Sequence, residues 1–222
     1  MLVTIDVVRF APGRAQRELL TTWRHPPGRQ GWVIFSANLT TIPGPMVRWT
    51  EVGCLSTWDS AADRDAFDAR APLARRWAEH AREHCTLLLD PVKSHGALRG
   101  SDPIQASGSR VDGPALVLTS ARMTARGYIP VWRTNPAIVR HLRQQPGLLW
   151  HHAWADHVMG LGTLSLWADG SDATRFAYGG DSHRRGIEGG RRKGWLSESL
   201  FSRFRLLEAR GTLGGRRLPV PE

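Results

Sequence analysis

One histidine lies in a stretch rich in glycine and arginine that has the spacing of a helix face. His183 belongs to the run Ser182-His183-Arg184-Arg185, and positions 183, 186, 187 and 190 share one helical face, where they read His, Gly, Ile, Gly. A glycine inside a helix costs about 1 kcal/mol relative to alanine, and room for a flat ligand beside the imidazole would explain that cost. A neutral imidazole can bind a metal, although the same pattern also fits an ordinary, partly exposed helix histidine.

A second motif offers metal chemistry in the first half of the chain. The segment His80-Ala81-Arg82-Glu83-His84 has the H-x-x-E-H order of inverted zinc proteases, in which two histidines bind zinc and the glutamate acts as a base. It lies at the end of a predicted helix, next to a strand, and has no evident third ligand, so coincidence explains it better. The sequence shows no phosphate-binding loop, nucleophile elbow, or flavin or nicotinamide fingerprint.

The composition does not have the pattern typical of a nucleic-acid-binding protein. The 222 residues carry a formal charge of +10, from 30 Lys and Arg against 20 Asp and Glu, but the arginines are spread along the chain. The charge favours anionic partners, including carboxylates on a cofactor. Ten tryptophans are many for this length, and either core packing or a wide apolar cavity would require them.

The sequence gives no sign of export or of a membrane span. It opens MLVTIDVVRF, with alternating strand residues instead of a basic segment and a long apolar run. The two cysteines, Cys54 and Cys85, fit a reducing compartment better than a disulfide framework. We therefore expect a cytoplasmic protein.

The predicted elements occur in the same order twice. In each half, the patterns of alternation and helical spacing predict the order β-α-β-β-α-β, which is the ferredoxin-like unit. Superposing Leu55-Ser56-Thr57-Trp58 on Leu164-Ser165-Leu166-Trp167 gives an offset of 109 residues, which also places Gly53 on Gly162 and Phe67 on Phe176. We predict a helix running from Asp59 or Ser60 toward His84 and interrupted at Pro72, and a last helix and strand after the Gly194-Trp195 turn.

This duplication predicts the α+β class and a single-chain version of the dimeric α+β barrel, with the helices outside. The predicted parts are an N-terminal repeat over 1–92, a linker over 93–114, a C-terminal repeat carrying the site over 115–210, and a tail over 211–222. Because one chain can close its own barrel, either a monomer or a homodimer is expected.

The stretch from about 115 to 215 resembles the spheroidene monooxygenase family of carotenoid-oxidising enzymes. The residues that carry the resemblance are Val117-Leu118-Thr119-Ser120-Ala121-Arg122, Trp132-Arg133, Pro136, Ser165-Leu166-Trp167, Phe176, Ser182-His183-Arg184-Arg185, and Gly194-Trp195 with Glu198, Leu200, Phe201, Arg203 and Phe204. The first hundred residues match the family only in length and layout. The glycines near His183 depart from the family, which more often shows an alanine and a valine there.

The resemblance implies haem b, with His183 as the axial ligand of the iron. The opposite axial position is then left for oxygen, peroxide or substrate. The residues expected around the cofactor are Gly186, Ile187 and Gly190 on the same helical face, with Arg184 and Arg191 as partners for its propionates. An oxygenase of this kind needs an external reductase or uses peroxide.

The opposite side of the cofactor is inferred from strand alternation. Alternation assigns Trp150, His152 and Trp154 to the barrel interior, together with Trp32 from the first half. We expect His152 to serve as an acid or base, assisted by Arg122, and the three tryptophans to line the substrate pocket.

Three classes of function are consistent with the sequence. The first is a haem-dependent oxygenase acting on an apolar or amphipathic small molecule, with dehydration or N-oxidation as other reactions of the same scaffold. The second is a cofactor-free monooxygenase of the antibiotic-biosynthesis type, and the third is a non-catalytic binder with a basic surface.

Overall fold

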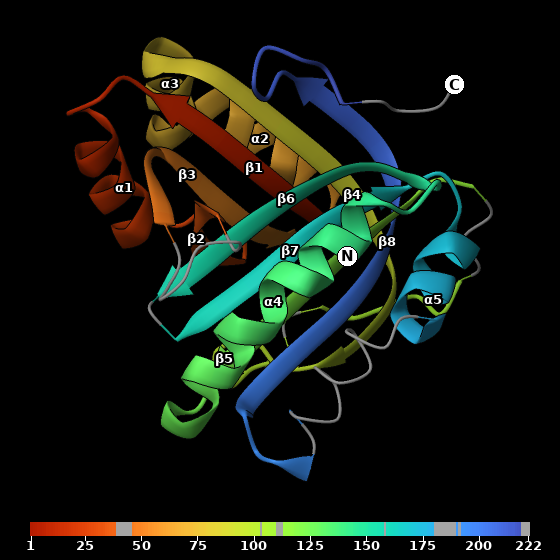
Figure 1. Cartoon of the computed structure of the whole chain (residues 1–222). Helices are drawn as coiled ribbons and strands as arrows, with labels where there is room; N and C mark the ends of the chain where they lie inside the picture. The colour runs from red at the N-terminus through yellow and green to blue at the C-terminus, as the bar shows by residue number, and fades with distance from the viewer. Residues whose placement is uncertain are drawn as a thin grey trace.

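The structure is a computed structural model that describes residues 1–38, 46–102, 104–109, 113–157, 159–179, 190 and 192–218. Two β-α-β-β-α-β units follow each other along the chain (Figure 1). The first comprises β1 (Leu2–Phe10), α1 (Ala15–Arg24), β2 (Gln30–Asn38), β3 (Met46–Trp58), α2 (Ala61–Arg70), α3 (Pro72–His80) and β4 (Ala81–Gly96). The second comprises β5 (Ala115–Met123), the short helix η1 (Ala125–Gly127), α4 (Tyr128–Arg143), β6 (Leu148–His157), β7 (Gly160–Trp167), α5 (Gly170–Gly179) and β8 (Leu196–Gly211).

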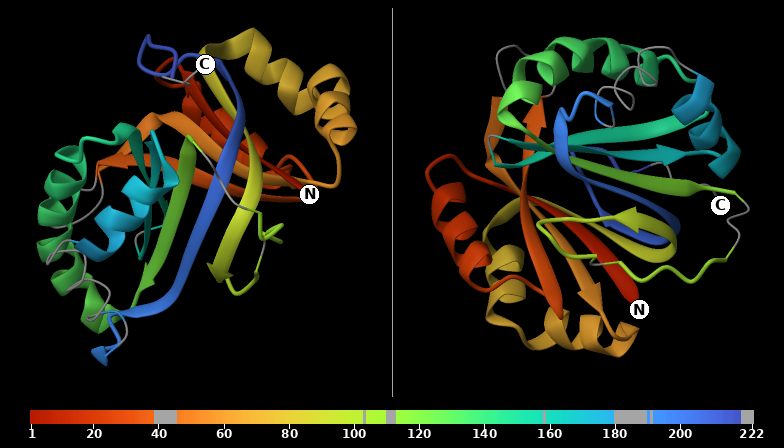
Figure 2. Two further views of the ribbon diagram at one scale, coloured as in Figure 1. Left: turned by 90° about the vertical axis from the view of Figure 1, so that its right-hand side faces the viewer. Right: turned by 90° about the horizontal axis from the view of Figure 1, so that it is seen from below.

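The strands form one closed antiparallel barrel in the order β1-β3-β2-β6-β7-β5-β8-β4. Each half supplies four neighbouring strands, so the two sheets meet at two seams. The helices lie outside, those of the first half on one side of the barrel and α4 and α5 on the other (Figure 2). The predicted fold, a single-chain barrel of the dimeric α+β type, is therefore confirmed.

The two seams differ in length among the described residues. The β4–β8 seam pairs eleven residues of β4, from Cys85 to Gly96, with residues of β8. The β2–β6 seam pairs Phe35 with Ala155 and Ser36 with Trp154. The long seam therefore holds the two sheets together along most of the barrel.

The barrel interior is an apolar core because each strand alternates inward and outward residues. Its buried members come from β1, β3 and every strand of the second half as well as β4: Val3, Ile5, Val7, Leu55, Cys85, Leu87, Leu89, Leu116, Leu118, Trp154, Leu164, Leu166, Leu200 and Phe204. On the outer face of the first half, Val8, Val52 and Cys54 pack against Leu73 and Trp77 of α3.

Three secondary-structure predictions were wrong. The predicted interruption at Pro72 is correct, since Pro72 begins the separate helix α3, but the second helix ends at His80 and the chain is strand from Ala81. The predicted last helix after Trp195 is the first part of β8, since burial alternates along Leu196–Gly211. β4 also extends to Gly96, into the predicted linker.

Candidate active site

The outer face of the second-half sheet carries two separate apolar clusters, to which α4 and α5 contribute. One comprises Met123, Trp132, Val139, Ala155 and Leu161, with Leu196 packed against it. The other comprises Val117, Leu142, Trp167 and Ala173, with Phe176 and Phe201 packed against it. α4 supplies residues to both clusters, and α5 supplies Ala173 and Phe176 to the second.

Between these clusters the sheet presents small residues. Along β5 the outward residues run from Val117 in one cluster, through Thr119 and Ala121, to Met123 in the other. Thr163 of β7 pairs with Thr119, and the two hydroxyl oxygens lie 2.8 Å apart. Ala153 of β6 pairs with Thr163 on the other side. We call Thr119, Ala121, Ala153 and Thr163 the threonine floor; all four are half-buried, less covered than the clusters on either side.

His151 lies on the same outer face, one step along β6 from the threonine floor. It pairs with Ser165 of β7, and Arg143 at the end of α4 donates from Nε to its Nε2 at 3.0 Å. Burial, assisted by the charge of Arg143, lowers the pKa of His151 below its ordinary value. A neutral imidazole that accepts at Nε2 carries its proton on Nδ1, so His151 can donate one hydrogen bond.

The chain reaches opposite sides of the threonine floor before and after the segment that contains His183. Phe176 near the end of α5 stacks on His141 of α4 with ring centroids 5.5 Å apart, beside the second cluster. Gly190 lies against the first cluster, because a Cβ there would be 2.9 Å from Cδ1 of Leu196. His183, Arg184, Gly186, Ile187 and Arg191 lie outside the described residues.

The predicted substrate-pocket residues of β6 come together in the barrel interior, on the opposite face from the threonine floor. Trp150 and His152 stack with ring centroids 5.7 Å apart and planes 6° apart, and Trp154 is buried in the core. Burial lowers the pKa of His152 to about 4; the nearby Glu51 works against this, while Arg48, His151 and Arg9 add to it. The predicted interior positions are correct, but α4 and α5 cover the other face.

Of the remaining predicted residues, Arg122 is directed away from the threonine floor. Arg122 of β5 pairs with Gly160 and Glu198 and alternates with Ala121, which puts it on the interior side. Trp32 pairs with Leu55, an interior residue, through the backbone; its side chain lies outside the described part. Strand alternation was applied correctly to both faces, but the sequence did not reveal which face the helices leave partly open.

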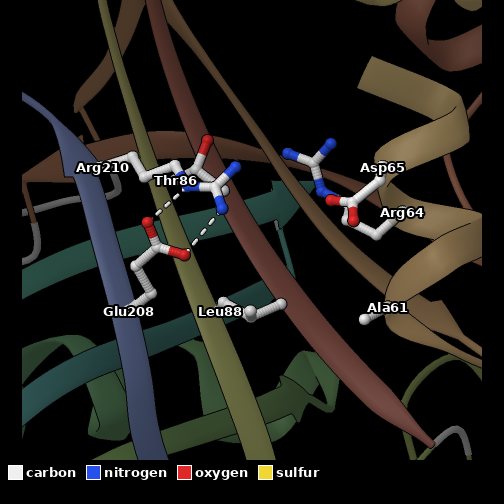
Figure 3. A pocket seen from close by; sticks show the side chains of 7 residues that line it. All are labelled: Ala61, Arg64, Asp65, Thr86, Leu88, Glu208 and Arg210. Carbon is white, nitrogen blue, oxygen red and sulfur yellow. Dashed lines mark hydrogen bonds and ion pairs between the residues drawn. The ribbon is translucent and has the colours of Figure 1, made fainter. Parts of the chain in front are cut away.

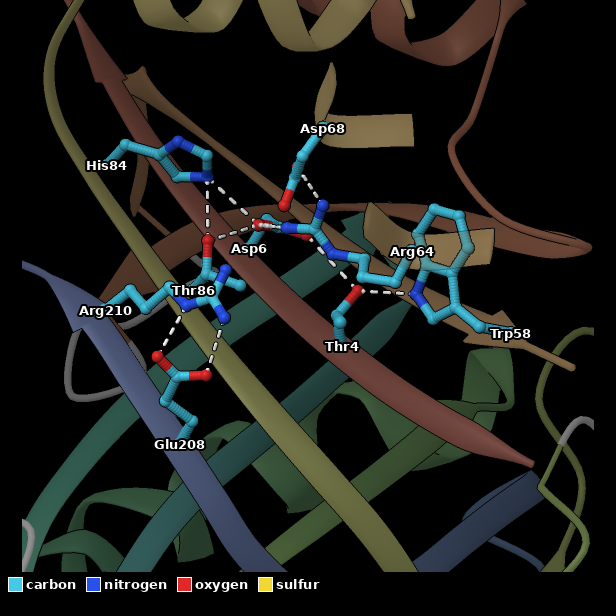
Figure 4. Close-up of polar contacts among 9 residues, drawn as sticks. All are labelled: Thr4, Asp6, Trp58, Arg64, Asp68, His84, Thr86, Glu208 and Arg210. Atoms are coloured by element: carbon cyan, nitrogen blue, oxygen red, sulfur yellow. Dashed lines mark hydrogen bonds and ion pairs between the residues drawn. The ribbon is translucent and has the colours of Figure 1, made fainter. Parts of the chain in front are cut away.

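The equivalent place in the first half is filled by charged side chains. The offset of 109 residues relates Cys54 of β3 to Thr163 of β7. Cys54 pairs with Asp6, and Thr163 pairs with Thr119, so Asp6 takes the place in the first half that Thr119 has in the second. The fully buried Asp6 carboxylate accepts a hydrogen bond from Thr86 Oγ1 at 2.7 Å and lies 3.0 Å from His84 Nε2 (Figure 4).

Arg64 of α2 completes this network, 3.5 Å from Asp6, and its guanidinium also pairs with Asp68. Burial raises the pKa of Asp6, but the hydrogen bond and charge of His84, with Arg64 and Thr86, lower it by more, so the net shift is downward. A small cavity beside the network is lined by Arg64, Thr86 and the Glu208–Arg210 ion pair of β8 (Figure 3). The two halves therefore share a backbone plan but differ in the chemistry of this position.

The structure rules out the zinc reading of the H-x-x-E-H segment. His80 ends α3, whereas Glu83 and His84 belong to β4 and so point to opposite faces of the strand. His84 faces Asp6, and Glu83 pairs with Arg9 and accepts from the backbone amide of Gly214 at 3.2 Å. Within the described residues, no group of three or more His, Cys, Asp or Glu side chains is placed to hold a metal ion. Among the same residues, no helix has the length and apolar character needed to span a membrane.

The fold is similar to that of solved aldoxime dehydratases. One structure, a complex with butyraldoxime, aligns with a TM-score of 0.61 and 11% identity over 93% of this chain and 79% of that chain. Another aligns with a TM-score of 0.59 and 10% identity over 92% of this chain and 80% of that chain. At this level of identity the likeness shows the shared fold alone.

Sequence comparison identifies relatives over most of the chain. No protein-family profile matches it. The spheroidene monooxygenase of Rhodobacter capsulatus is 28% identical over 183 residues, which cover 78% of this chain and 73% of that protein. The spheroidene monooxygenase of Cereibacter sphaeroides is 26% identical over 198 residues, which cover 85% of this chain but only 58% of that protein. These matches extend well beyond residues 115–215, so the chain is related to the spheroidene monooxygenases over most of its length.

Proposed function

We propose that this protein is a haem-dependent oxygenase of the monooxygenase type, which acts on an apolar or amphipathic small molecule. The similarity to spheroidene monooxygenases supports the class of reaction, and the threonine floor supports its location on the outer face of the second half. The proposed role is carotenoid or other secondary-metabolite oxidation, and His183 is the proposed axial ligand of haem b.

The described residues fit a flat apolar cofactor in the second half and not in the first. The threonine floor is small and uncharged, and apolar clusters border it on both sides. A macrocycle could lie there without leaving a buried charge unpaired. At the equivalent place in the first half, Asp6, His84 and Arg64 occupy the space and satisfy one another, so a second haem would have to displace them.

When bound, haem would supply the activation of oxygen or peroxide. The residues of this chain would exclude water and place hydrogen-bond donors. The paired hydroxyls of Thr119 and Thr163 can each rotate to donate to a ligand over the floor. His151 can donate from Nδ1 while Arg143 holds its ring, which makes His151 a further candidate donor beside the predicted His152.

Two other candidates from the sequence remain as rivals. The likeness to aldoxime dehydratases concerns the fold and so does not favour dehydration over oxygenation. A cofactor-free monooxygenase would use the same barrel with substrate in place of the cofactor, and it would remain colourless.

An absorption spectrum of protein expressed with added haem tests the proposal. We expect a Soret band in the wild type that is lost or shifted in His183→Ala. His25→Ala, which changes an exposed histidine just after α1, is the matched control and should keep the wild-type spectrum. A wild-type protein that takes up no haem would refute the haem proposal and favour the cofactor-free monooxygenase.

A further inference from the structure

Helix α1 packs Ala15 and Leu19 against the first-half core but leaves two other large apolar side chains in solvent. Its buried residues are Ala15, Glu18 and Thr22, two of which are polar. Leu20 and Trp23, by contrast, are 53% and 65% exposed. A surface helix normally buries such apolar side chains against the core. The exposed side of α1 therefore holds apolar area that the described residues leave uncovered.

An ion pair attaches the polar side of α1 to the neighbouring helix α3. Glu18 is fully buried and accepts from the Arg76 guanidinium of α3 at 2.8 and 3.1 Å. Arg14 lies 3.7 Å from the same carboxylate, and the Thr22 hydroxyl bonds the carbonyl of Glu18 at 2.8 Å. The pair with Arg76, together with the packing of Ala15 and Leu19 on the core, fixes the rotation of the helix, so that Leu20 and Trp23 point outward.

Basic residues accompany the exposed apolar pair. Arg17 precedes Leu20 by three positions and Arg24 follows it by four, so both share its side of the helix, and both are exposed. Helices that lie in the interface of a lipid bilayer typically carry leucine and tryptophan bordered by arginines, as α1 does here. α1 also lies at the edge of the molecule, away from α4 and α5 (Figure 1).

We propose that the exposed side of α1, formed by Arg17, Leu20, Trp23 and Arg24, binds the surface of an anionic lipid bilayer. The formal charge of +10 attracts the whole protein to such a surface. A second copy of the chain is a poorer occupant, because a two-fold contact through this helix would bring Arg17 and Arg24 against the same residues of the partner. The proposal does not depend on the haem proposal.

Co-sedimentation with sucrose-loaded vesicles tests this proposal. The vesicles contain phosphatidylcholine alone or phosphatidylcholine mixed with phosphatidylglycerol. We expect the wild type to bind the mixed vesicles and the double variant Leu20→Ser/Trp23→Ser to bind about tenfold or more weakly, because apolar area would no longer enter the bilayer. Arg17→Gln and Arg24→Gln should each weaken binding to the mixed vesicles about fivefold.

Ile129→Ser and Leu207→Ser are matched controls, since these residues are 51% and 47% exposed on α4 and β8 and should not affect binding. Absence of wild-type binding to the mixed vesicles would overturn the proposal, as would unchanged binding of the double variant. If sedimentation equilibrium shows a wild-type dimer that the double variant dissociates, a second copy covers this helix and the proposal is wrong.

Discussion

The hydroxyl oxygens of Thr119 and Thr163 lie 2.8 Å apart on the outer face of the second-half sheet. The duplication relates this pair to Asp6 and Cys54 of the first half. One position of the repeat thus carries a neutral hydroxyl pair in one half and a buried ion network in the other. A duplicated barrel in which one half keeps the site and the other gains an internal network would show this asymmetry.

Two substitutions of Thr163 separate the effect of side-chain size on haem uptake from the effect of the hydroxyl group. Thr163→Leu should abolish haem uptake because its larger side chain fills the floor, whereas Thr163→Val keeps the volume and should retain haem with an altered spectrum. Haem titration followed at the Soret band measures both. Full uptake by Thr163→Leu would show that the cofactor lies elsewhere.

The Asp6 network should make stability sensitive to acid. Because the folded-state pKa of Asp6 is lowered, its contribution is complete above the unfolded pKa of about 3.8 and is lost as the pH falls through the folded value. Asp6→Asn should lower the free energy of unfolding at neutral pH by about 3–5 kcal/mol, since Arg64 loses a buried partner. Urea unfolding measures this loss. A change no larger than that of Asp59→Asn, an exposed aspartate, would contradict it.

His152 should control stability in a different pH window. Its folded-state pKa is about 4, below its ordinary value of 6.5, so the unfolded chain binds more protons between these values. Stability should therefore fall as the pH falls from about 6.5 to 4. In His152→Gln this slope should be reduced, while the loss caused by Asp6 at lower pH remains. Urea midpoints measured across this pH range test the prediction. An equal pH dependence of stability in the wild type and in His152→Gln would refute it.

Gly162 allows Trp154 to lie across β7. A Cβ at Gly162 would collide with the Trp154 ring and with the carbonyl oxygen of Thr119. Gly162→Val should lower the free energy of unfolding by about 1–3 kcal/mol and change the near-ultraviolet circular dichroism of the tryptophans. An unchanged spectrum and urea midpoint would mean that the barrel has room at this point.

The duplication made most of the fold predictable. The offset derived from matching Leu55 to Leu164 places both residues in the interior core, so the two halves also correspond in which face is buried. Strand alternation likewise placed Trp150, His152 and Trp154 in the interior. Local periodicity was sufficient here because successive strand residues alternate between the barrel interior and the outer face, where the helices pack.

The candidate site was less predictable because it depends on what the helices leave uncovered. The residue types of Thr119, Ala153 and Thr163 are ordinary for strands. They can be identified as a candidate site only from the apolar clusters that border them in the structure. His151 and His152 are adjacent in sequence and point to opposite faces of the sheet. The face on which α4 packs determines which of them lies beside the threonine floor. The H-x-x-E-H motif requires one helix through both histidines, but α3 ends at His80 and the rest of the segment lies in β4.

Because its two seams are unequal, the barrel should open locally at one of them before the other. Opening the β2–β6 seam breaks few backbone hydrogen bonds among the described residues, whereas opening the β4–β8 seam breaks a long ladder. Local opening of low free energy should therefore begin at Phe35 and Ser36, with the two sheets swinging apart about β4 and β8. Trp154 pairs with Ser36 at that line, so deuterium and small quenchers should enter the core beside this tryptophan first.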